Sequence, residues 1–223
     1  MRLLSTKILS QDFRERLLMH QFSLVEQPFI KVSNIENPKI HSLLDGLIFT
    51  SQNAVKAILS SPETLKMIEE KNTYCVGRKT AALLAENGQK VVKIAKNSSE
   101  LAQFLAKNCR NESFSYFCGK LRTPHLEEIL PAKGMRIQPI EVYETHLIDR
   151  IVKGHFDGIL FFSPSGVRGY AQSNGFENTH SFCLGSSTAK EVALYTSNYT
   201  IAKEPNVSQL LLSLKNHITL HEE

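Results

Sequence analysis

The sequence lacks the patterns that mark several functional classes. Its four cysteines, Cys75, Cys109, Cys118 and Cys183, form no CxxC pair, and its eight histidines form no cluster at metal-ligand spacing. This argues against a zinc site and against a disulfide framework. No apolar run approaches the roughly 20 residues needed to cross a bilayer, and the N-terminus has neither the apolar core nor the cleavage site of a signal peptide. We therefore expect a cytoplasmic protein that makes no membrane contact.

An excess of charge of one sign is also missing. Twenty-six Lys and Arg against 22 Asp and Glu give a net charge of +4 at pH 7, without the basic block expected of a nucleic-acid binder. The small excess suits an anionic small molecule, although a solvated surface explains it as well. The sequence contains no GxxxxGK[ST], GxGxxG or HExxH motif and no nucleophile elbow. Any catalysis is therefore expected to use hydroxyl groups, backbone dipoles and shape.

An internal repeat is the most informative feature that is present. Asp45–Leu59 (DGLIFTSQNAVKAIL) returns 112 residues later as Asp157–Ala171 (DGILFFSPSGVRGYA). Three further blocks recur. Residues 75–81 return as 183–189, and residues 94–96 return as 201–203. Met1–Val32 returns as Phe114–Val142, and within this block Ser5–Lys7 is expected to match Cys118–Lys120. In a chain of 223 residues, this repeat predicts two related domains of about 110 residues, each large enough to bury a core.

Short apolar runs alternate with helical patterns, which predicts parallel sheets with helical crossovers. We expect ten strands, five in each domain: Arg2–Leu4, Leu24–Val32, Leu47–Thr50, Thr73–Val76, Lys90–Ile94, Phe114–Cys118, Ile137–Val142, Gly158–Phe162, Ser181–Leu184 and Tyr199–Ala202. The expected helices are Gln11–His20, Gln52–Ser60, Arg78–Asn87, Ser98–Lys107, Pro124–Leu130, Gly166–Ser173, Ser187–Tyr195 and Val207–His217.

The order of the repeated blocks permits two domain divisions. One is a tandem split near residue 111. The other inserts the central blocks into a domain made from both ends of the chain, and it needs two crossings, for which Ser33–Lys39 and Tyr143–Arg150 are candidates. The repeat pattern alone does not choose between them.

Loops rich in hydroxyl groups follow the apolar strand in both copies of the strongest repeat. Thr50 and Ser51 follow one strand, and Ser163, Ser165 and Gly166 follow the other. In a parallel sheet, ligands bind beyond the carboxyl ends of the strands, where the next helix presents unpaired N–H groups and the positive end of its dipole. Hydroxyls beside such donors favour a carboxylate or phosphate. A ligand larger than one loop could be bound by both copies.

The next block repeats this arrangement with Gly77 and Thr80 in one copy and Gly185 and Thr188 in the other. Glycine at such a position lets a ligand approach the backbone closely. The alternative is that each Ser or Thr only caps its own helix, which contributes about 1 kcal/mol to helix stability.

Three further polar features lie near predicted strand ends. Lys120 and Arg122 follow Cys118-Gly119 and either hold acidic groups or are solvated charges. Tyr143 is expected at the end of a strand beside a crossing, where its hydroxyl either faces a ligand or makes the single hydrogen bond that a packed tyrosine usually makes.

Taken together, these motifs resemble the uroporphyrinogen-III synthase family. The resemblance is carried by Phe49–Val55, Val76–Gly77 with Thr80–Ala81, Val142–Thr145, Asp157–Val167 and Gly185–Ala189. It implies an α/β fold of two flavodoxin-like domains with parallel sheets, related by the internal repeat and joined by a two-stranded linker. It also implies the insertion: residues 1–33 with 147–223 form a discontinuous domain, residues 38–142 form the inserted domain, and residues 34–37 and 143–146 are the linker crossings.

The resemblance further implies a reaction in tetrapyrrole and haem biosynthesis. Enzymes of this family are cyclising hydro-lyases that close linear hydroxymethylbilane to uroporphyrinogen III, with loss of water and inversion of the D ring through a spiro intermediate. They use no metal and no organic cofactor. We accordingly expect a monomer whose partner is a small-molecule polycarboxylate, with no nucleic acid and no membrane.

Site residues carry over position by position. Tyr143 matches the tyrosine regarded as assisting loss of the hydroxyl, and a tyrosine with an ordinary pKa of about 10 has a proton to donate at neutral pH. The resemblance implies substrate contacts at Thr50, Ser51, Gly77, Thr80, Ser163, Ser165, Gly166 and Thr188. Gly119, Lys120 and Arg122 are added from a segment that fits the family pattern loosely. Lys7 stands where many relatives have arginine, which keeps the charge but loses bidentate binding of a carboxylate.

A hypothesis from another class stays open. A non-catalytic two-domain protein that binds an anionic metabolite would share the architecture and the loops at the helix starts. It would give Tyr143 no special role.

Overall fold

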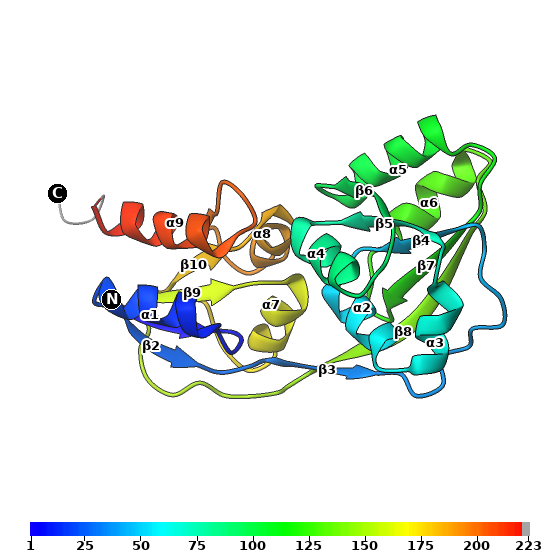
Figure 1. Ribbon diagram of the computed structural model, residues 1–223. Helices are drawn as coiled ribbons and strands as arrows, with labels where there is room; N and C mark the ends of the chain where they lie inside the picture. Colours follow the sequence, from blue (N-terminus) through cyan, green and yellow to red (C-terminus); the bar gives the residue numbers. More distant parts are fainter. Residues whose placement is uncertain (220–223) are drawn as a thin grey trace. The chain divides into compact units, whose positions relative to one another are not determined.

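The computed structural model describes residues 1–219, and the chain divides into two compact units (Figure 1). Unit 1 comprises Met1–Lys31 and His146–Glu223, and unit 2 comprises Val32–Thr145. The chain therefore leaves unit 1 once and returns to it once. Within the described residues, no helix combines the length and the apolar content needed to span a bilayer.

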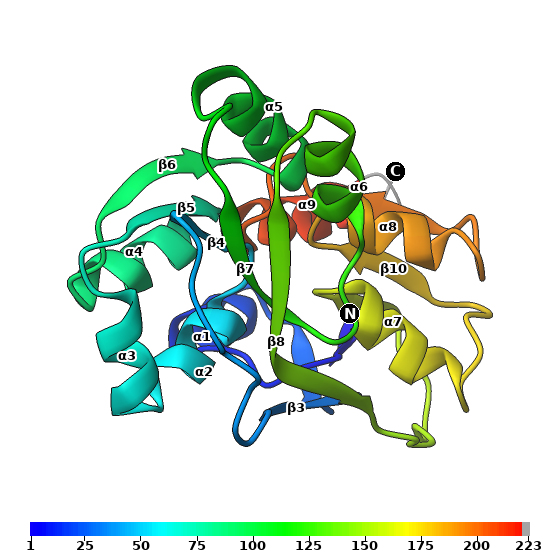
Figure 2. The same ribbon diagram turned by 90° about the vertical axis from the view of Figure 1, so that its right-hand side faces the viewer.

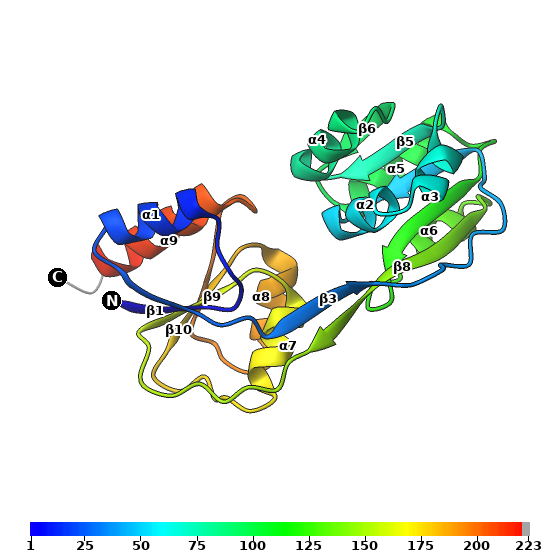
Figure 3. The ribbon, with the colours of Figure 1, turned by 60° about the horizontal axis from the view of Figure 1, so that its bottom comes forward.

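Unit 1 contains a five-stranded parallel sheet in the spatial order β11-β10-β9-β1-β2. Its strands are β1 (Arg2–Ser5), β2 (Ser23–Glu26), β9 (Gly158–Phe161), β10 (His180–Cys183) and β11 (Tyr199–Ile201). Two helices pack on each face. One face carries α1 (Gln11–Met19) and α9 (Val207–Thr219), which lie side by side in Figure 3, and the other carries α7 (Pro164–Ala171) and α8 (Ser186–Val192).

Unit 2 contains a six-stranded sheet in the order β3-β8-β7-β4-β5-β6. Its strands are β3 (Ile30–Asn34), β4 (Gly46–Phe49), β5 (Asn72–Val76), β6 (Val91–Ala95), β7 (Phe114–Gly119) and β8 (Ile137–Leu147). One face carries α2 (Gln52–Leu59), α3 (Pro62–Ile68) and α4 (Arg78–Glu86), and the other carries α5 (Ser98–Asn108) and α6 (His125–Ala132). Figure 2 shows β4, β7 and β8 following one another across this sheet.

The central strands β4 and β9 are apolar along their whole length, as expected of strands with both faces buried. Leu47 and Phe49 pack into the cluster with α2, α3 and α4, whereas Ile48 between them packs against α5 and α6. In β1, Leu3 and Leu4 divide in the same way between the two faces of the unit 1 sheet. This confirms the prediction of parallel sheets covered by helices on both faces.

The repeated blocks occupy equivalent places in the two sheets. The order β6-β5-β4-β7-β8 in unit 2 corresponds strand by strand to β11-β10-β9-β1-β2 in unit 1. The register corrects one detail of the repeat. Gly46 pairs with Phe114 and Gly158 with Leu3, so that Ser5 is equivalent to Tyr116, and the expected match of Ser5–Lys7 to Cys118–Lys120 is wrong by two residues.

The prediction of one strand over Leu24–Val32 is wrong. The segment forms β2 and β3, which belong to different sheets. Pro28 lies between them and lacks the N–H that a strand needs. The next residue, Phe29, is fully buried against Gly169 and Tyr170, which anchors the chain between the two strands.

One additional helix and one strand boundary also differ from expectation. A short helix, α3, follows α2, and it is capped by Ser61, whose Oγ accepts a hydrogen bond from Thr64 N at 3.4 Å. Strand β8 continues to Leu147, so Tyr143 lies inside a strand and not at its end. The extension pairs with β3 (Figure 3). Two backbone hydrogen bonds flank this pairing, from Ile35 N to Val142 O (3.0 Å) and from Ile148 N to Phe29 O (2.8 Å).

Candidate functional site

The strand order of unit 2 places a topological switch point between β4 and β7. The chain leaves β4 toward β5 on one side and leaves β7 toward β8 on the other. In open α/β sheets, ligands bind at the carboxyl ends of the strands beside such a point. The residues at these two strand ends include five that the sequence predicts as substrate contacts: Thr50, Ser51, Gly119, Lys120 and Arg122.

Thr50 and Ser51 have different roles in this loop. Ser51 caps α2, and its Oγ accepts a hydrogen bond from Asn53 N at 3.1 Å, which is the structural role considered from the sequence. Thr50 does not cap the helix. Its Oγ1 lies 2.9 Å from the hydroxyl of Tyr116, a buried residue of β7. Sequence reasoning missed Tyr116, because within an apolar strand only its hydroxyl distinguishes it from a core aromatic.

Tyr143 lies on β8 directly against the end of β7. It pairs with Gly119, and a Cβ on Gly119 would lie 2.5 Å from Tyr143 Cζ and 2.9 Å from its hydroxyl. The backbone of the next residue completes the contact, since Lys120 N donates to Tyr143 O at 3.0 Å. The ring therefore packs on the backbone of Gly119, and the side chain of any larger residue at position 119 would occupy the space that the ring now takes.

Arg122 is bound by carboxylates of its own unit. Its guanidinium donates to Glu127 on α6 at 2.8 Å and to Glu141 on β8 at 2.7 Å, and more weakly to Gly119 O at 3.4 Å. The hydrogen bonds to Glu127 and Glu141 raise the pKa of Arg122 above its ordinary value. Arg122 thus fixes the loop after β7 to two neighbouring elements. Lys120 is more exposed, with its Nζ 4.0 Å from Glu144.

The neighbouring strand β5 ends at Val76, and Gly77 follows it as the N-cap of α4. Gly77 has a φ of +87°, a conformation that glycine adopts without strain, and its N donates to Ala95 O at 2.9 Å. Thr80 is buried in the first turn of the helix. Both residues lie at the carboxyl ends of the strands, one strand away from the switch point.

Unit 1 has the equivalent switch point between β9 and β1. Ser163 caps α7, and its Oγ accepts from Gly166 N at 3.1 Å and lies 3.1 Å from Ser165 Oγ. Thr6, which the sequence did not indicate, follows β1, and its hydroxyl donates to Leu160 O at 2.8 Å. A Cβ on Gly166 would lie 3.5 Å from Thr6 Oγ1, so the first turn of α7 lies next to the segment after β1.

Lys7 and Thr188 complete this end of the unit 1 sheet. Lys7 Nζ lies 4.3 Å from the centroid of the Phe162 ring, at the distance of a cation–π contact. Thr188 is buried in the first turn of α8, after β10.

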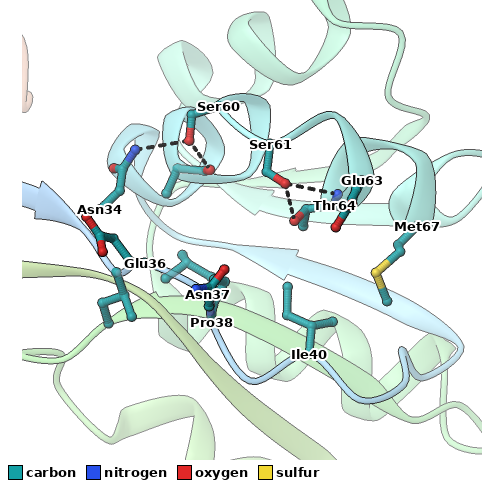
Figure 4. Close-up of a pocket in the computed structure, with 13 residues that line it drawn as sticks. Asn34, Glu36, Asn37, Pro38, Ile40, Ser60, Ser61, Glu63, Thr64 and Met67 are labelled. Carbon is teal, nitrogen blue, oxygen red and sulfur yellow. Dashed lines mark hydrogen bonds between the residues drawn. The ribbon is translucent and has the colours of Figure 1, made fainter.

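A pocket of unit 2 lies away from these strand ends (Figure 4). It has a volume of about 520 Å³ and is lined by Asn34–Pro38 after β3 and by residues of α2 and α3. Asn34 Nδ2 donates to Ser60 Oγ at 3.1 Å across it. None of the site residues predicted from the sequence lines this pocket. Within residues 1–219, no group of three His, Cys, Asp or Glu side chains is placed to hold a metal ion.

A family match decides what kind of protein carries these loops. The profile of the family described as "Uroporphyrinogen-III synthase HemD" matches residues 11–211, most of the chain. The chain belongs to the uroporphyrinogen-III synthase family. The uroporphyrinogen-III synthase of Chlorobaculum parvum is 23% identical to it over 182 residues, which cover 73% of this chain and 74% of the relative.

Solved structures of uroporphyrinogen-III synthases share the fold. That of the Helicobacter pylori protein matches with a TM-score of 0.69 at 20% identity, covering 97% of this chain and all of the other. A structure of a mutant Thermus thermophilus protein matches with a TM-score of 0.70 at 15% identity, covering 100% of this chain and 99% of the other. At such identities the similarity supports the two-unit α/β fold of the uroporphyrinogen-III synthases alone, and the roles of single residues must be argued from the geometry of this chain.

Proposed function

We propose that this chain cyclises hydroxymethylbilane to uroporphyrinogen III, with loss of water and inversion of the D ring. Its membership of the uroporphyrinogen-III synthase family supports the reaction. The geometric observation that carries it is the packing of Tyr143 on Gly119 at the switch point of unit 2. This contact holds a phenol hydroxyl beside the loops where an open α/β sheet binds its ligand. A non-catalytic binding protein would need no such phenol.

The substrate carries acetate and propionate groups, which hydroxyls and backbone N–H groups at helix starts are suited to bind. We propose that each unit binds part of it through its own strand-end loops. The contacts in unit 2 are Thr50, Ser51, Gly77, Thr80, Gly119, Lys120 and Arg122, and those in unit 1 are Ser163, Ser165, Gly166 and Thr188. Arg122 is also paired with Glu127 and Glu141, so besides contacting the substrate it holds the loop after β7 in place. Residues 34–37 and 143–146 are the proposed crossings between the two domains.

Tyr143 assists the first chemical step in this proposal. Its O–H donates a proton to the hydroxyl of the substrate's hydroxymethyl group, the C–O bond breaks, and water leaves. The carbon that loses the hydroxyl then bonds to the already substituted α position of the D ring, which gives the spiro intermediate. The existing methylene bond to that position breaks and reforms at the free α position of the D ring, and the proton released there balances the one that Tyr143 donated. Hydroxymethylbilane also closes unassisted, without inversion. The protein must therefore hold the chain in the arrangement from which the inverted closure is faster.

The substitution Tyr143→Phe tests this assignment. It removes the hydroxyl and keeps the ring on Gly119, so we expect kcat for uroporphyrinogen III formation to fall by about 100-fold, the usual contribution of general acid catalysis, while the affinity for product changes little. Tyr199→Phe, at a half-buried tyrosine of β11, is the matched control and should leave kcat unchanged. Full activity of Tyr143→Phe would remove Tyr143 from the mechanism.

We further propose that the protein acts in the cytoplasm as a monomer. Its four cysteines are buried free thiols, which suits a reducing compartment. Neither nucleic acid nor a membrane is needed for the proposed reaction. Light scattering on the purified protein measures the oligomeric state directly, and a stable dimer would contradict the proposal.

A further inference from the structure

The hydroxyl of Tyr116 reaches the candidate site from inside the core of unit 2. The Tyr116 ring is packed in the apolar cluster formed with α5 and α6, and only 4% of the residue is exposed. Its hydroxyl lies 2.9 Å from Thr50 Oγ1, at the carboxyl end of the neighbouring strand. The contact therefore joins β7 to the loop after β4 beside the switch point.

The chemistry of the two hydroxyls decides which one donates. Burial raises the pKa of Tyr116 to about 12, although the hydrogen bond with Thr50 lowers it in part, so the phenol stays protonated. A phenol is a stronger donor than an aliphatic hydroxyl, which favours Tyr116 as the donor and Thr50 Oγ1 as the acceptor. Within residues 1–219, Thr50 Oγ1 has no second hydrogen-bond partner, so its own proton remains available for a ligand.

The internal repeat shows that the fold does not require this contact. In unit 1, the residues equivalent to Tyr116 and Thr50 are Ser5 and Phe162. Ser5 donates instead to Lys7 O at 2.6 Å, and Phe162 packs into the apolar core. The same strand arrangement therefore forms without a hydroxyl pair, and the pair belongs to unit 2 alone.

We propose that Tyr116 is a positioning residue, which orients the hydroxyl of Thr50 so that its proton points to a carboxylate group of the substrate. The inference rests on the proposed function and adds to it the residue that prepares one anion contact. A hydroxyl held by a buried donor binds an anion better than a freely rotating one, because its orientation is already fixed and the bond from Tyr116 polarises it.

A double-mutant cycle tests the inference. The variants are Tyr116→Phe, Thr50→Val and the double variant, and the measured quantities are KM for hydroxymethylbilane and kcat. Tyr116→Phe should raise KM about fivefold, the effect of losing one hydrogen bond, and change kcat by less than about twofold. In the Thr50→Val background, the same substitution should have no further effect. An equal rise in KM in both backgrounds would mean that Tyr116 is only structural, and it would overturn the inference.

Two further variants control for changes in folding. Tyr170→Phe removes the hydroxyl of another buried tyrosine, which donates to Gly175 O at 2.7 Å in unit 1, and it should leave KM unchanged. Thr50→Ser keeps the hydroxyl and should retain most of the affinity that Thr50→Val loses. A Thr50→Ser variant as weak as Thr50→Val would contradict the role of the hydroxyl, even if Tyr116→Phe failed to fold.

The inference and the proposed function fail in different ways. If the unmodified protein forms no uroporphyrinogen III, the proposed function is wrong. The same variants are then titrated with uroporphyrin III, the stable oxidised form of the product. Loss of affinity on Tyr116→Phe that depends on Thr50 would still support the positioning role, and equal affinities across all variants would contradict it.

Discussion

At the residue scale, the repeat separates residues that build the sheets from residues that stand at the site. The dipeptide Asp45-Gly46 builds unit 2, since Asp45 Oδ2 accepts from Ser113 N at 2.9 Å and Ser113 Oγ at 2.7 Å. Its copy in unit 1 does the same, since Asp157 accepts from Arg2 N at 2.6 Å. The glycine of each pair faces an aromatic ring that a Cβ would approach within 2.8 Å. The strongest identity in the repeat therefore encodes sheet assembly, not ligand binding.

Gly119 combines packing with the candidate site. In Gly119→Ala, the new Cβ would lie 2.5 Å from Tyr143 Cζ and must displace the ring, so we expect kcat to fall at least about tenfold, with a loss of about 1–3 kcal/mol in unfolding free energy. Gly46→Ala is the matched control, because its Cβ would lie 2.7 Å from the Phe114 ring at the opposite end of the strands. It should destabilise the protein and leave kcat nearly intact. Equal losses of kcat in both variants would show that Gly119 matters only for stability.

At the element scale, the central strands and most helices could be predicted from the sequence. Strands buried on both faces are short apolar runs, and the helices between them show the helical spacing of apolar residues. Other features depend on contacts between distant residues. The division of 24–32 into β2 and β3 depends on the burial of Phe29 against Gly169, and the contact of Thr50 with Tyr116 joins residues 66 positions apart. Neither leaves a local pattern. The start of α3 at Ser61-Pro62 did leave one, a capping serine followed by proline, and could have been found.

The start of β4 is tied to the start of β7 by a carboxylate, which gives a pH prediction. The hydrogen bonds from Ser113 lower the pKa of Asp45 below its ordinary value. A carboxyl group whose pKa is lower in the folded state stabilises the fold at pH values above its unfolded-state pKa of about 3.9. This contribution to the free energy of unfolding is lost as the pH falls through the folded-state pKa. Asp45→Asn should therefore lower the urea midpoint at pH 7, and its difference from the unmodified protein should shrink toward pH 2.

The exposed Asp12 provides the control for this measurement, since its carboxylate lies 3.9 Å from Arg16 and is 77% exposed. Asp12→Asn should hardly change the urea midpoint at either pH. A difference for Asp45→Asn that stays constant between pH 7 and pH 2 would contradict the role of the Asp45 charge.

At the scale of the whole molecule, two copies of one sheet carry different side chains at the same strand ends. Thr50 and Tyr116 of unit 2 are equivalent to Phe162 and Ser5 of unit 1, so the pair of hydroxyls at the switch point occurs in unit 2 alone. The sequence predicted most of the strand-end positions from the repeat and from the family resemblance. It missed Tyr116 and Thr6, which lie in or directly after apolar strands. The net charge of +4 is small, so attraction of an anionic substrate must come from these local groups.

If local charges and dipoles attract the polycarboxylate, its affinity for the protein should depend on the salt concentration. Raising the salt concentration from about 0.05 M to 0.5 M screens exposed charges, so the affinity for uroporphyrin III should weaken severalfold. Titrations monitored by porphyrin fluorescence measure this directly. An affinity that stays constant across that range would count against charge and dipole interactions as the source of binding.

The most direct test of the account is the isomer that the protein makes. Freshly generated hydroxymethylbilane is supplied without added metal, the product is oxidised, and type I and type III uroporphyrin are separated by chromatography. We predict mostly type III, formed faster than spontaneous closure forms type I. Type I alone, at the rate measured without protein, would contradict the account and leave a two-domain binding protein for anions as the better description.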